Sequence, residues 1–314
     1  MPQRNTRREV LRATGAAAGV GALAGCSSLF SGDSEGSVTV GSKNFTEQKI
    51  LGYIAYHALS ENTDLSIEDQ VNLGGTNTNF EALRNGDTDL YWEYTGTAWQ
   101  TLPPQHDSVI TDEEEIYDEV KAEFEDEHDI TLLERGPFDN TYVLLTNENW
   151  HEETGVETLS DLADYVKDGN TDVTVVMNAE FQERSDGWPG LIEAYDFESE
   201  AEELTVDNVD SGLTYQVVGE DEADVGMGFN TDPNILEFDL VVLEDDEEFF
   251  PVYNPVPLVR MDALEENDSI ESGLEGIAET LSNDTILELN RKVSIDEENA
   301  EDVARKHLQD NDLI

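Results

Sequence analysis

The stretch Asp89-Leu-Tyr-Trp-Glu-Tyr-Thr-Gly-Thr-Ala-Trp99 decides the fold class of this chain. Its first half, Asp89 to Tyr94, is an apolar and aromatic run that predicts a buried strand, and the Thr and Gly residues after it predict a turn. In open α/β sheets, ligands bind just beyond the carboxyl ends of the strands. Aromatic faces at such an end suit a cation that cannot donate a hydrogen bond. The stretch therefore predicts an α/β fold with a ligand site at this strand end.

Two strand–helix units precede this strand. Residues 37–41 and 65–73 have the composition of strands, and residues 50–59 carry apolar side chains at helical spacing. A second helix is predicted to contain Phe80 and to stop at Asn85-Gly86. The order β-α-β-α-β favours a mostly parallel sheet with helices on its faces.

The same pattern restarts after about residue 140. The downstream segments predict helices at 112–127, 159–166, 187–195 and 215–218, strands at 130–133, 141–146, 173–176, 224–229 and 240–243, and an interrupted helical tail at 270–308. We therefore predict two α/β lobes, the first made of residues 38–139 plus 251–314 and the second of 140–250. A cleft between two such lobes is a common place for a small-ligand site.

The N-terminus has the features of an export signal. Arg7 and Arg8 precede a run of small apolar residues that ends at Gly25, which predicts a Tat-type signal over residues 1–25. Cys26 is the single cysteine of the chain, and its context resembles the lipobox of exported lipoproteins. We predict lipidation of Cys26, a flexible tether at 26–37, and anchoring on the outer face of the cytoplasmic membrane. The alternative is a free thiol in an ordinary signal or anchor helix.

The charge of the chain is extreme. The chain has 16 Lys and Arg against 73 Asp and Glu, a formal charge of −57. Such self-repulsion destabilises a compact fold in dilute buffer, whereas molar salt screens it. The charge favours a halophilic protein and disfavours nucleic acid as a partner, because phosphate contacts need clustered cations. Alternatives are a calcium-binding surface or a disordered acidic protein, and the 38% hydrophobic content disfavours disorder.

Signatures of catalysis are absent from the sequence. The five histidines are scattered with no i,i+4 pair, and Gly-x-Ser-x-Gly, Walker and dinucleotide motifs do not occur. We therefore expect neither an enzyme nor a cofactor nor a metal. Carboxylate pairs are too numerous to be informative, so an exported carboxylate-dependent hydrolase stays an alternative, as does a surface lipoprotein with an adhesive or structural role.

Two of the rare cations stand where predicted strands meet loops. Lys43 follows the first strand, and Arg184 follows the strand at 173–176. Both positions are predicted ligand-facing ends. The alternative is that each is a surface cation that pairs with the abundant acids.

Five motifs, in this order, resemble the glycine betaine/choline substrate-binding proteins of osmoprotective ABC transporters, especially the ProX-like members that bind quaternary amines. They are GSKNFTEQ (41–48), NLGGT (72–76), EYTGTAW (93–99), FQERSDGWPG (181–190) and LEDDEEFFPVY (243–253). The resemblance covers residues 38–314. It implies a two-lobed, type II periplasmic-binding-protein-like fold with the ligand cleft between the lobes, and closure about hinges that we predict near 139–141 and 250–254.

The resemblance also implies a set of ligand residues. The aromatic box that holds the quaternary ammonium group would consist of Tyr94, Tyr142, Tyr215 and Phe229, the last at a position where ProX-like proteins have tyrosine. Tyr142 and Tyr215 have the alternative of ordinary core residues. The ligand carboxylate would bind Lys43, Thr97 and Arg184. Asn140 stands where the family can have an aspartate, and its own backbone carbonyl would still face the methyl groups.

The resemblance implies two kinds of partner, a small solute and the membrane components of an ABC transporter. We expect glycine betaine first, then proline betaine, choline or carnitine, together with an ABC permease and its ATPase. We expect a monomer that meets the membrane through its lipid anchor alone.

Overall fold

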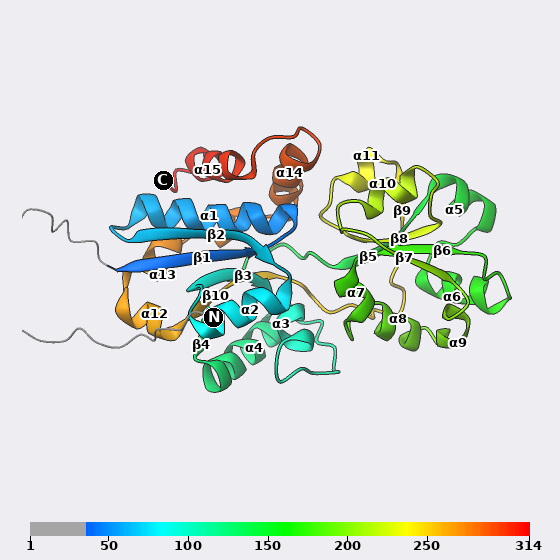
Figure 1. Ribbon diagram of the computed structural model, residues 1–314, viewed down its shortest axis with the longest axis horizontal. Coiled ribbons are helices and arrows are strands. Elements are labelled where there is room, and N and C mark those ends of the chain that lie inside the picture. The colour runs from blue at the N-terminus through cyan, green and yellow to red at the C-terminus, as the bar shows by residue number, and fades with distance from the viewer. Residues whose placement is uncertain (1–35) are drawn as a thin grey trace, which may run out of the picture. The chain divides into compact units, whose positions relative to one another are not determined.

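Two five-stranded sheets carry the elements of this chain (Figure 1). The structure, a computed structural model, describes residues 36–314, which belong to one unit spanning Ser34–Ile314. The predicted export signal, the lipidation at Cys26 and nearly all of the predicted tether lie outside the described residues. Within residues 36–314, no helix combines the length and the apolar character needed to cross a membrane.

Helices lie between the strands of both sheets, and four more follow the last strand, β10. They are α1 Thr46–Asn62, α2 Thr76–Asn85, α3 Thr95–Thr101, α4 Glu113–His128, α5 Glu148–Thr154, α6 Leu159–Lys167, α7 Ala179–Glu183, α8 Trp188–Ala194, α9 Glu198–Ala201, α10 Thr214–Gly219, α11 Asn234–Glu237, α12 Met261–Glu266, α13 Ser269–Leu274, α14 Asn283–Ser294 and α15 Ala300–Asp310. The predicted stop of α2 is confirmed, because Gly86 caps it in the left-handed conformation with φ 75°.

The first sheet has the order β2-β1-β3-β10-β4. Its strands are β1 Ser37–Lys43, β2 Ser66–Gly74, β3 Leu90–Tyr94, β4 Ile130–Leu132 and β10 Pro255–Arg260. The predicted parallel pairing of the first three strands is confirmed, but β10 runs antiparallel between β3 and β4, so the sheet as a whole is mixed.

The sequence pattern did not predict β10. Pro255 and Pro257 lie in it, and proline in a strand interior removes a ladder donor. The structure avoids that loss on one side, because the ladder to β4 spans Leu258–Arg260 and includes neither proline.

Side chains of β3 alternate between the two faces of the first sheet. Leu90 and Trp92 pack with the apolar stripe of α1, whereas Tyr91 packs with Phe80 of α2 and Phe124 of α4. Figure 1 shows α1 on one face and α2 and α4 on the other. Helices α14 and α15 pack against α1, so the C-terminal helices join this sheet.

The predicted turn after β3 is wrong, because residues 95–101 form helix α3. Threonine and glycine have low helix propensity, which favoured the turn. Packing explains the glycine at position 96, since a Cβ there would lie 2.8 Å from the carbonyl oxygen of Val252. The close approach of a neighbouring segment therefore selects glycine at this position.

The second sheet has the order β7-β6-β8-β5-β9. Its strands are β5 Tyr142–Asn147, β6 Thr174–Met177, β7 Thr205–Asn208, β8 Val225–Phe229 and β9 Leu240–Leu243. Strand β5 is antiparallel to both β8 and β9. Helices α10 and α11 lie on one face of this sheet and α6, α8 and α9 on the other (Figure 1). The short polar edge strand β7 was not predicted, because its sequence TVDN shows neither burial nor alternation.

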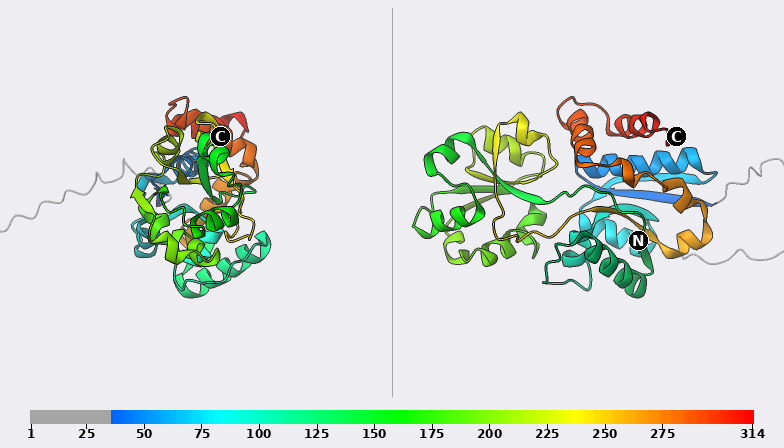
Figure 2. Two further views of the ribbon diagram at one scale, coloured as in Figure 1. Left: turned by 90° about the vertical axis from the view of Figure 1, so that its right-hand side faces the viewer. Right: turned by 180° about the vertical axis from the view of Figure 1, so that it is seen from behind.

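Residues 133–141 and 244–254 lead from one sheet to the other (Figure 2). These two segments are hydrogen bonded to each other. The backbone N–H of Asn140 donates to the carbonyl of Tyr253 at 3.1 Å, and the N–H of Tyr253 donates to Asp139 Oδ1 at 2.7 Å. The two connections therefore behave as one paired element.

Asp139 makes the stability of this paired element dependent on pH. Burial raises the pKa of Asp139 from its ordinary 3.8 to about 6. The folded chain then holds the proton more tightly than the unfolded chain, so this group's stabilisation is complete below about pH 4 and is lost as pH rises through about 6.

We expect Asp139→Asn, which keeps an oxygen acceptor for Tyr253, to raise the thermal midpoint at pH 8 and to give little gain at pH 4. Scanning calorimetry of both proteins at constant salt measures the difference. A difference that is the same at every pH would contradict this assignment.

Candidate ligand-binding site

A cavity of about 40 Å³ lies where strands of both sheets end. It is lined by seven of the eight predicted ligand residues, Lys43, Tyr94, Thr97, Asn140, Tyr142, Arg184 and Phe229, together with Asn44, Phe45, Asn178, Glu180, Ser211 and Tyr253. A wider cleft of about 500 Å³ shares seven lining residues with it, Asn44, Phe45, Asn140, Asn178, Glu180, Ser211 and Phe229. The small cavity is thus the inner part of a larger opening.

Strand ends place these side chains. Lys43 ends β1, Tyr94 ends β3 and Phe229 ends β8. Tyr142 begins β5, which is antiparallel to β8 and pairs Tyr142 with Phe229. The cavity therefore occupies the edge of both sheets at which the sequence predicted ligand binding.

Aromatic rings form one wall of the cavity. The rings of Phe45 and Phe229 stack with centroids 5.3 Å apart, and Tyr94 lies 6.4 Å from Phe45. Tyr142 lies 5.1 Å from Phe229 and meets Tyr253 edge-on at 5.5 Å. Sequence reasoning missed the roles of Phe45 and Tyr253, although both belong to motifs that it identified.

Tyr215, the fourth predicted ring of the box, is not among the residues that line the cavity. It is fully buried in α10 and packs with Val143 and Leu145 behind the second sheet. The backbone N–H of Phe229 donates to its hydroxyl at 2.8 Å. In this structure Tyr215 therefore contacts the backbone of a cavity residue rather than the cavity.

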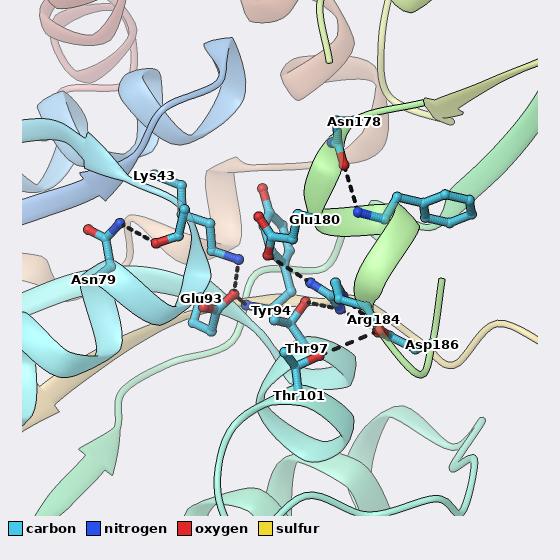
Figure 3. A network of polar contacts seen from close by, with 12 residues as sticks. Lys43, Asn79, Glu93, Tyr94, Thr97, Thr101, Asn178, Glu180, Arg184 and Asp186 are labelled. Atoms are coloured by element: carbon cyan, nitrogen blue, oxygen red, sulfur yellow. Dashed lines mark hydrogen bonds and ion pairs between the residues drawn. The ribbon is translucent and has the colours of Figure 1, made fainter. Parts of the chain in front are cut away.

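Lys43 has a carboxylate partner inside the site. Its ammonium group forms an ion pair with Glu93, which is fully buried, and lies 5.2 Å from the ring centroid of Tyr94 (Figure 3). Burial raises the pKa of Glu93, and the adjacent Lys43 opposes that rise.

Arg184 contacts side chains on both sides of the site (Figure 3). It forms a two-pronged ion pair with Asp186, with Nε donating at 2.6 Å, and its Nη1 donates to Glu180 at 3.2 Å. Its Nη2 also donates to the hydroxyl of Thr97 at 3.2 Å, and its Cζ lies 5.4 Å from the ring centroid of Tyr142. Although burial opposes it, the guanidinium lowers the pKa of Asp186. Arg184 thus joins α3 of the first sheet to residues of the second.

The two predicted carboxylate-binding cations are therefore already compensated. Glu93 compensates Lys43, while Asp186 and Glu180 compensate Arg184. The sequence could not single out these three acids, because they are among 73. Two cations against three carboxylates leave a net charge of 2 − 3 = −1, so a ligand carboxylate would have to compete with these acids for the cations.

Asn140 contacts its surroundings mainly through its side chain. Its Nδ2 donates to Glu47 at 2.9 Å, and its Oδ1 lies 2.9 Å from the hydroxyl of Thr231, whose single proton can be donated either to Oδ1 or to Glu47. The family resemblance predicts a contact through the backbone carbonyl of Asn140, and no motif in the sequence points to Glu47 or Thr231 as its partners.

Comparison with known proteins places this site in a family. Residues 36–310 match the family described as the substrate binding domain of ABC-type glycine betaine transport system. The chemotactic signal transduction system substrate-binding protein CosB of Halobacterium salinarum is 33% identical over 88% of this chain and 85% of its own length. The glycine betaine-binding protein YehZ of Escherichia coli is 28% identical over 87% of this chain and 90% of its own.

Solved structures agree with the fold. Apo YehZ superposes with a TM-score of 0.63 at 26% identity, over 88% of this chain and 99% of that one. A glycine betaine/carnitine/choline ABC transporter structure has a TM-score of 0.68 at 24% identity, with the same coverage. The predicted two-lobed α/β binding-protein fold is confirmed. The chain belongs to the family of substrate-binding domains of ABC-type glycine betaine transport systems, a family of binding proteins rather than of enzymes.

Proposed function

We propose that this chain captures glycine betaine, or a closely related quaternary ammonium solute, outside the cytoplasm and presents it to an ABC permease. The observation that carries the proposal is one cavity lined both by aromatic rings and by the polar side chains of Lys43, Thr97 and Arg184. The relatives YehZ and the carnitine transport binding protein OpuCC of Listeria monocytogenes, 27% identical over 90% of this chain, support this class of ligand.

The aromatic wall suits the cationic pole of such a solute. A trimethylammonium group has no N–H, so a protein cannot select it with hydrogen-bond acceptors. Each ring face contributes about 0.5–2 kcal/mol, depending on how completely water is excluded. Tyr94, Tyr142 and Phe229, together with Phe45 and Tyr253, offer enough faces for several kcal/mol before ordering costs.

The polar side chains beside these rings suit a carboxylate, since Lys43 lies over the ring of Tyr94 and Arg184 over that of Tyr142. Lys43 supplies a point charge, Thr97 a hydroxyl donor, and Arg184 a planar guanidinium. A carboxylate that approaches these donors would compete with Glu93, Glu180 and Asp186 for them. A ligand with its own anionic end gains contacts here that choline lacks, which is why we place glycine betaine first.

We further propose that the solute is enclosed by closure of two lobes, 38–139 plus 251–314 and 140–250, about the paired connections near 139–141 and 250–254. Contacts between the two sheets support this, because Arg184 reaches Thr97 and Thr231 reaches Glu47. Export by the N-terminal segment, lipid attachment at Cys26 and a monomeric state are parts of the same proposal.

Calorimetry tests the ligand. Titration at about 3 M NaCl, where surface charges are screened, with glycine betaine, proline betaine, carnitine and choline should show micromolar or tighter binding of glycine betaine and weaker binding of choline. Absence of heat with all four solutes would refute the proposed function. Choline binding more tightly than betaine would refute the assignment of the carboxylate pole.

A chemotaxis transducer is a second candidate partner. CosB, at 33% identity, is a binding protein of a chemotactic signal transduction system. Deletion of the gene should abolish uptake of labelled betaine if a permease is the partner, and should abolish attraction toward betaine with uptake unchanged if a transducer is the partner.

A further inference from the structure

The first turn of α1 buries a carboxylate beside the aromatic wall. Glu47 is 2% exposed and lines the wider cleft next to Phe45. Across residues 36–314, no Lys, Arg or His forms an ion pair with it. A buried carboxylate without a cation is costly unless hydrogen bonds compensate it.

Four side chains supply such bonds from four separate parts of the chain. Oε1 of Glu47 accepts from the hydroxyl of Tyr94 at 2.6 Å and from Nδ2 of Asn140 at 2.9 Å. Oε2 lies 2.8 Å from the hydroxyl of Thr231 and accepts from Nδ2 of Asn290 at 2.9 Å. The positive end of the α1 dipole favours the ionised form as well, because Glu47 lies in the first turn of that helix.

The network joins the two sheets. Tyr94 ends β3 of the first sheet, whereas Thr231 follows β8 of the second. Asn290 of α14 also donates to the backbone carbonyl of Thr231 at 3.1 Å. Separation of the two sheets would therefore break the bonds that Thr231 makes to Glu47 and Asn290.

Among residues 36–314, Glu47 has no ion-pair partner, whereas Glu93 and Asp186 each have one. Asp232 in the wider cleft has no ion pair within these residues either, but the hydroxyl of Tyr94 is hydrogen bonded to Glu47. Lys43 and Arg184 are paired with carboxylates, so their fields are largely cancelled at a distance. The field of Glu47 is not cancelled and acts in a poorly polarisable interior. Because the Tyr94 hydroxyl donates to Glu47, the ring behind it gains electron density at the face that lines the cavity.

We propose that Glu47 is a specificity-determining residue: its buried negative charge, acting through the hydroxyl of Tyr94, makes the aromatic end of the cavity prefer a cationic group over a neutral group of the same shape. This inference rests on the proposed function. Glu47 acts through Tyr94 and is therefore a positioning residue. Its bond to Thr231 links the same carboxylate to closure of the two lobes.

The decisive comparison uses glycine betaine and 3,3-dimethylbutanoate, in which carbon replaces the quaternary nitrogen. Burial raises the pKa of Glu47, and its hydrogen bonds oppose that rise, so titrations belong at about pH 8. Glu47→Gln should weaken betaine binding at least about tenfold and change binding of 3,3-dimethylbutanoate less than about threefold, measured by calorimetry or competition.

Two further variants separate charge from structure. Thr231→Val removes one bond to Glu47 and keeps its charge, so it should preserve the preference for betaine over the neutral probe. Glu61→Gln makes the same chemical change at the exposed far end of α1 and should leave both affinities unchanged. Thermal melting of each variant reports whether it is folded.

The outcomes are distinct. Betaine affinity of Glu47→Gln within about threefold of wild type overturns the inference, as does an equal loss for both probes or the same loss of preference in Thr231→Val. If the wild-type protein binds neither probe, the proposed function fails instead.

Discussion

Arg184→Gln should weaken glycine betaine binding by at least about thirtyfold, since loss of one partner of a buried, hydrogen-bonded charge pair costs about 2–5 kcal/mol. The substitution removes the guanidinium that contacts Thr97 and faces the ring of Tyr142. It also leaves Asp186, which is fully buried, without its cation. Calorimetry at high salt measures the affinity, and thermal melting measures the accompanying loss of stability.

Two controls separate the ligand role of Arg184 from its role as counter-ion. The double variant Arg184→Gln/Asp186→Asn removes both charges, so it should regain much of the lost stability without regaining affinity. Arg184→Lys keeps the charge but loses the planar guanidinium, so its affinity for glycine betaine should lie between those of the wild type and Arg184→Gln. If the double variant recovered betaine binding, Arg184 would be a structural counter-ion and not a ligand residue.

Transfer from about 3 M to about 0.1 M NaCl should strongly destabilise the protein and unfold much of it at room temperature. The chain carries a formal charge of −57, and the Debye length grows from about 3 Å at 1 M to about 10 Å at 0.1 M salt. Repulsion between neighbouring acids then acts over the spacing of adjacent helix turns. The exposed acids of α4 illustrate this, since Glu114 and Asp118 are one turn apart.

Circular dichroism melts over a series of salt concentrations measure this effect. Sucrose at matched water activity is the control, because it does not screen charge. The variant Glu114→Gln/Asp118→Asn should need less salt for the same midpoint. A thermal midpoint that is independent of NaCl and KCl would refute adaptation to high salt.

The parts of the fold that could be predicted are those that sequence patterns along the chain indicate. Strand β3 and the stop of α2 at Gly86 depend on neighbours within a few residues. The parallel pairing of the first three strands follows from the alternation of strands and helices along the chain. Strand β10 escaped prediction because its prolines argue locally against a strand, and partners distant in sequence override that preference.

The site was predictable where a motif carries both the residue and its strand end. Tyr94, Thr97 and Lys43 are of this kind. Glu47 was not predictable, because its four donors lie far apart in the sequence and meet only in the folded chain. Tyr215 was predicted to line the cavity but packs in the core behind the second sheet. Its motif does not indicate which face of α10 turns toward the cavity.

The position of β10 also constrains the order in which the chain can fold during synthesis. Because β10 lies between β3 and β4, the first sheet stays divided until residues 255–260 have left the ribosome. All strands of the second sheet lie within residues 142–243 and are complete earlier. Until β10 arrives, the inner edge of β3 remains open to mispairing with other chains. The nascent protein is therefore most prone to aggregation before residues 255–260 emerge, when β3, whose end contributes to the solute-binding site, still lacks its neighbour β10.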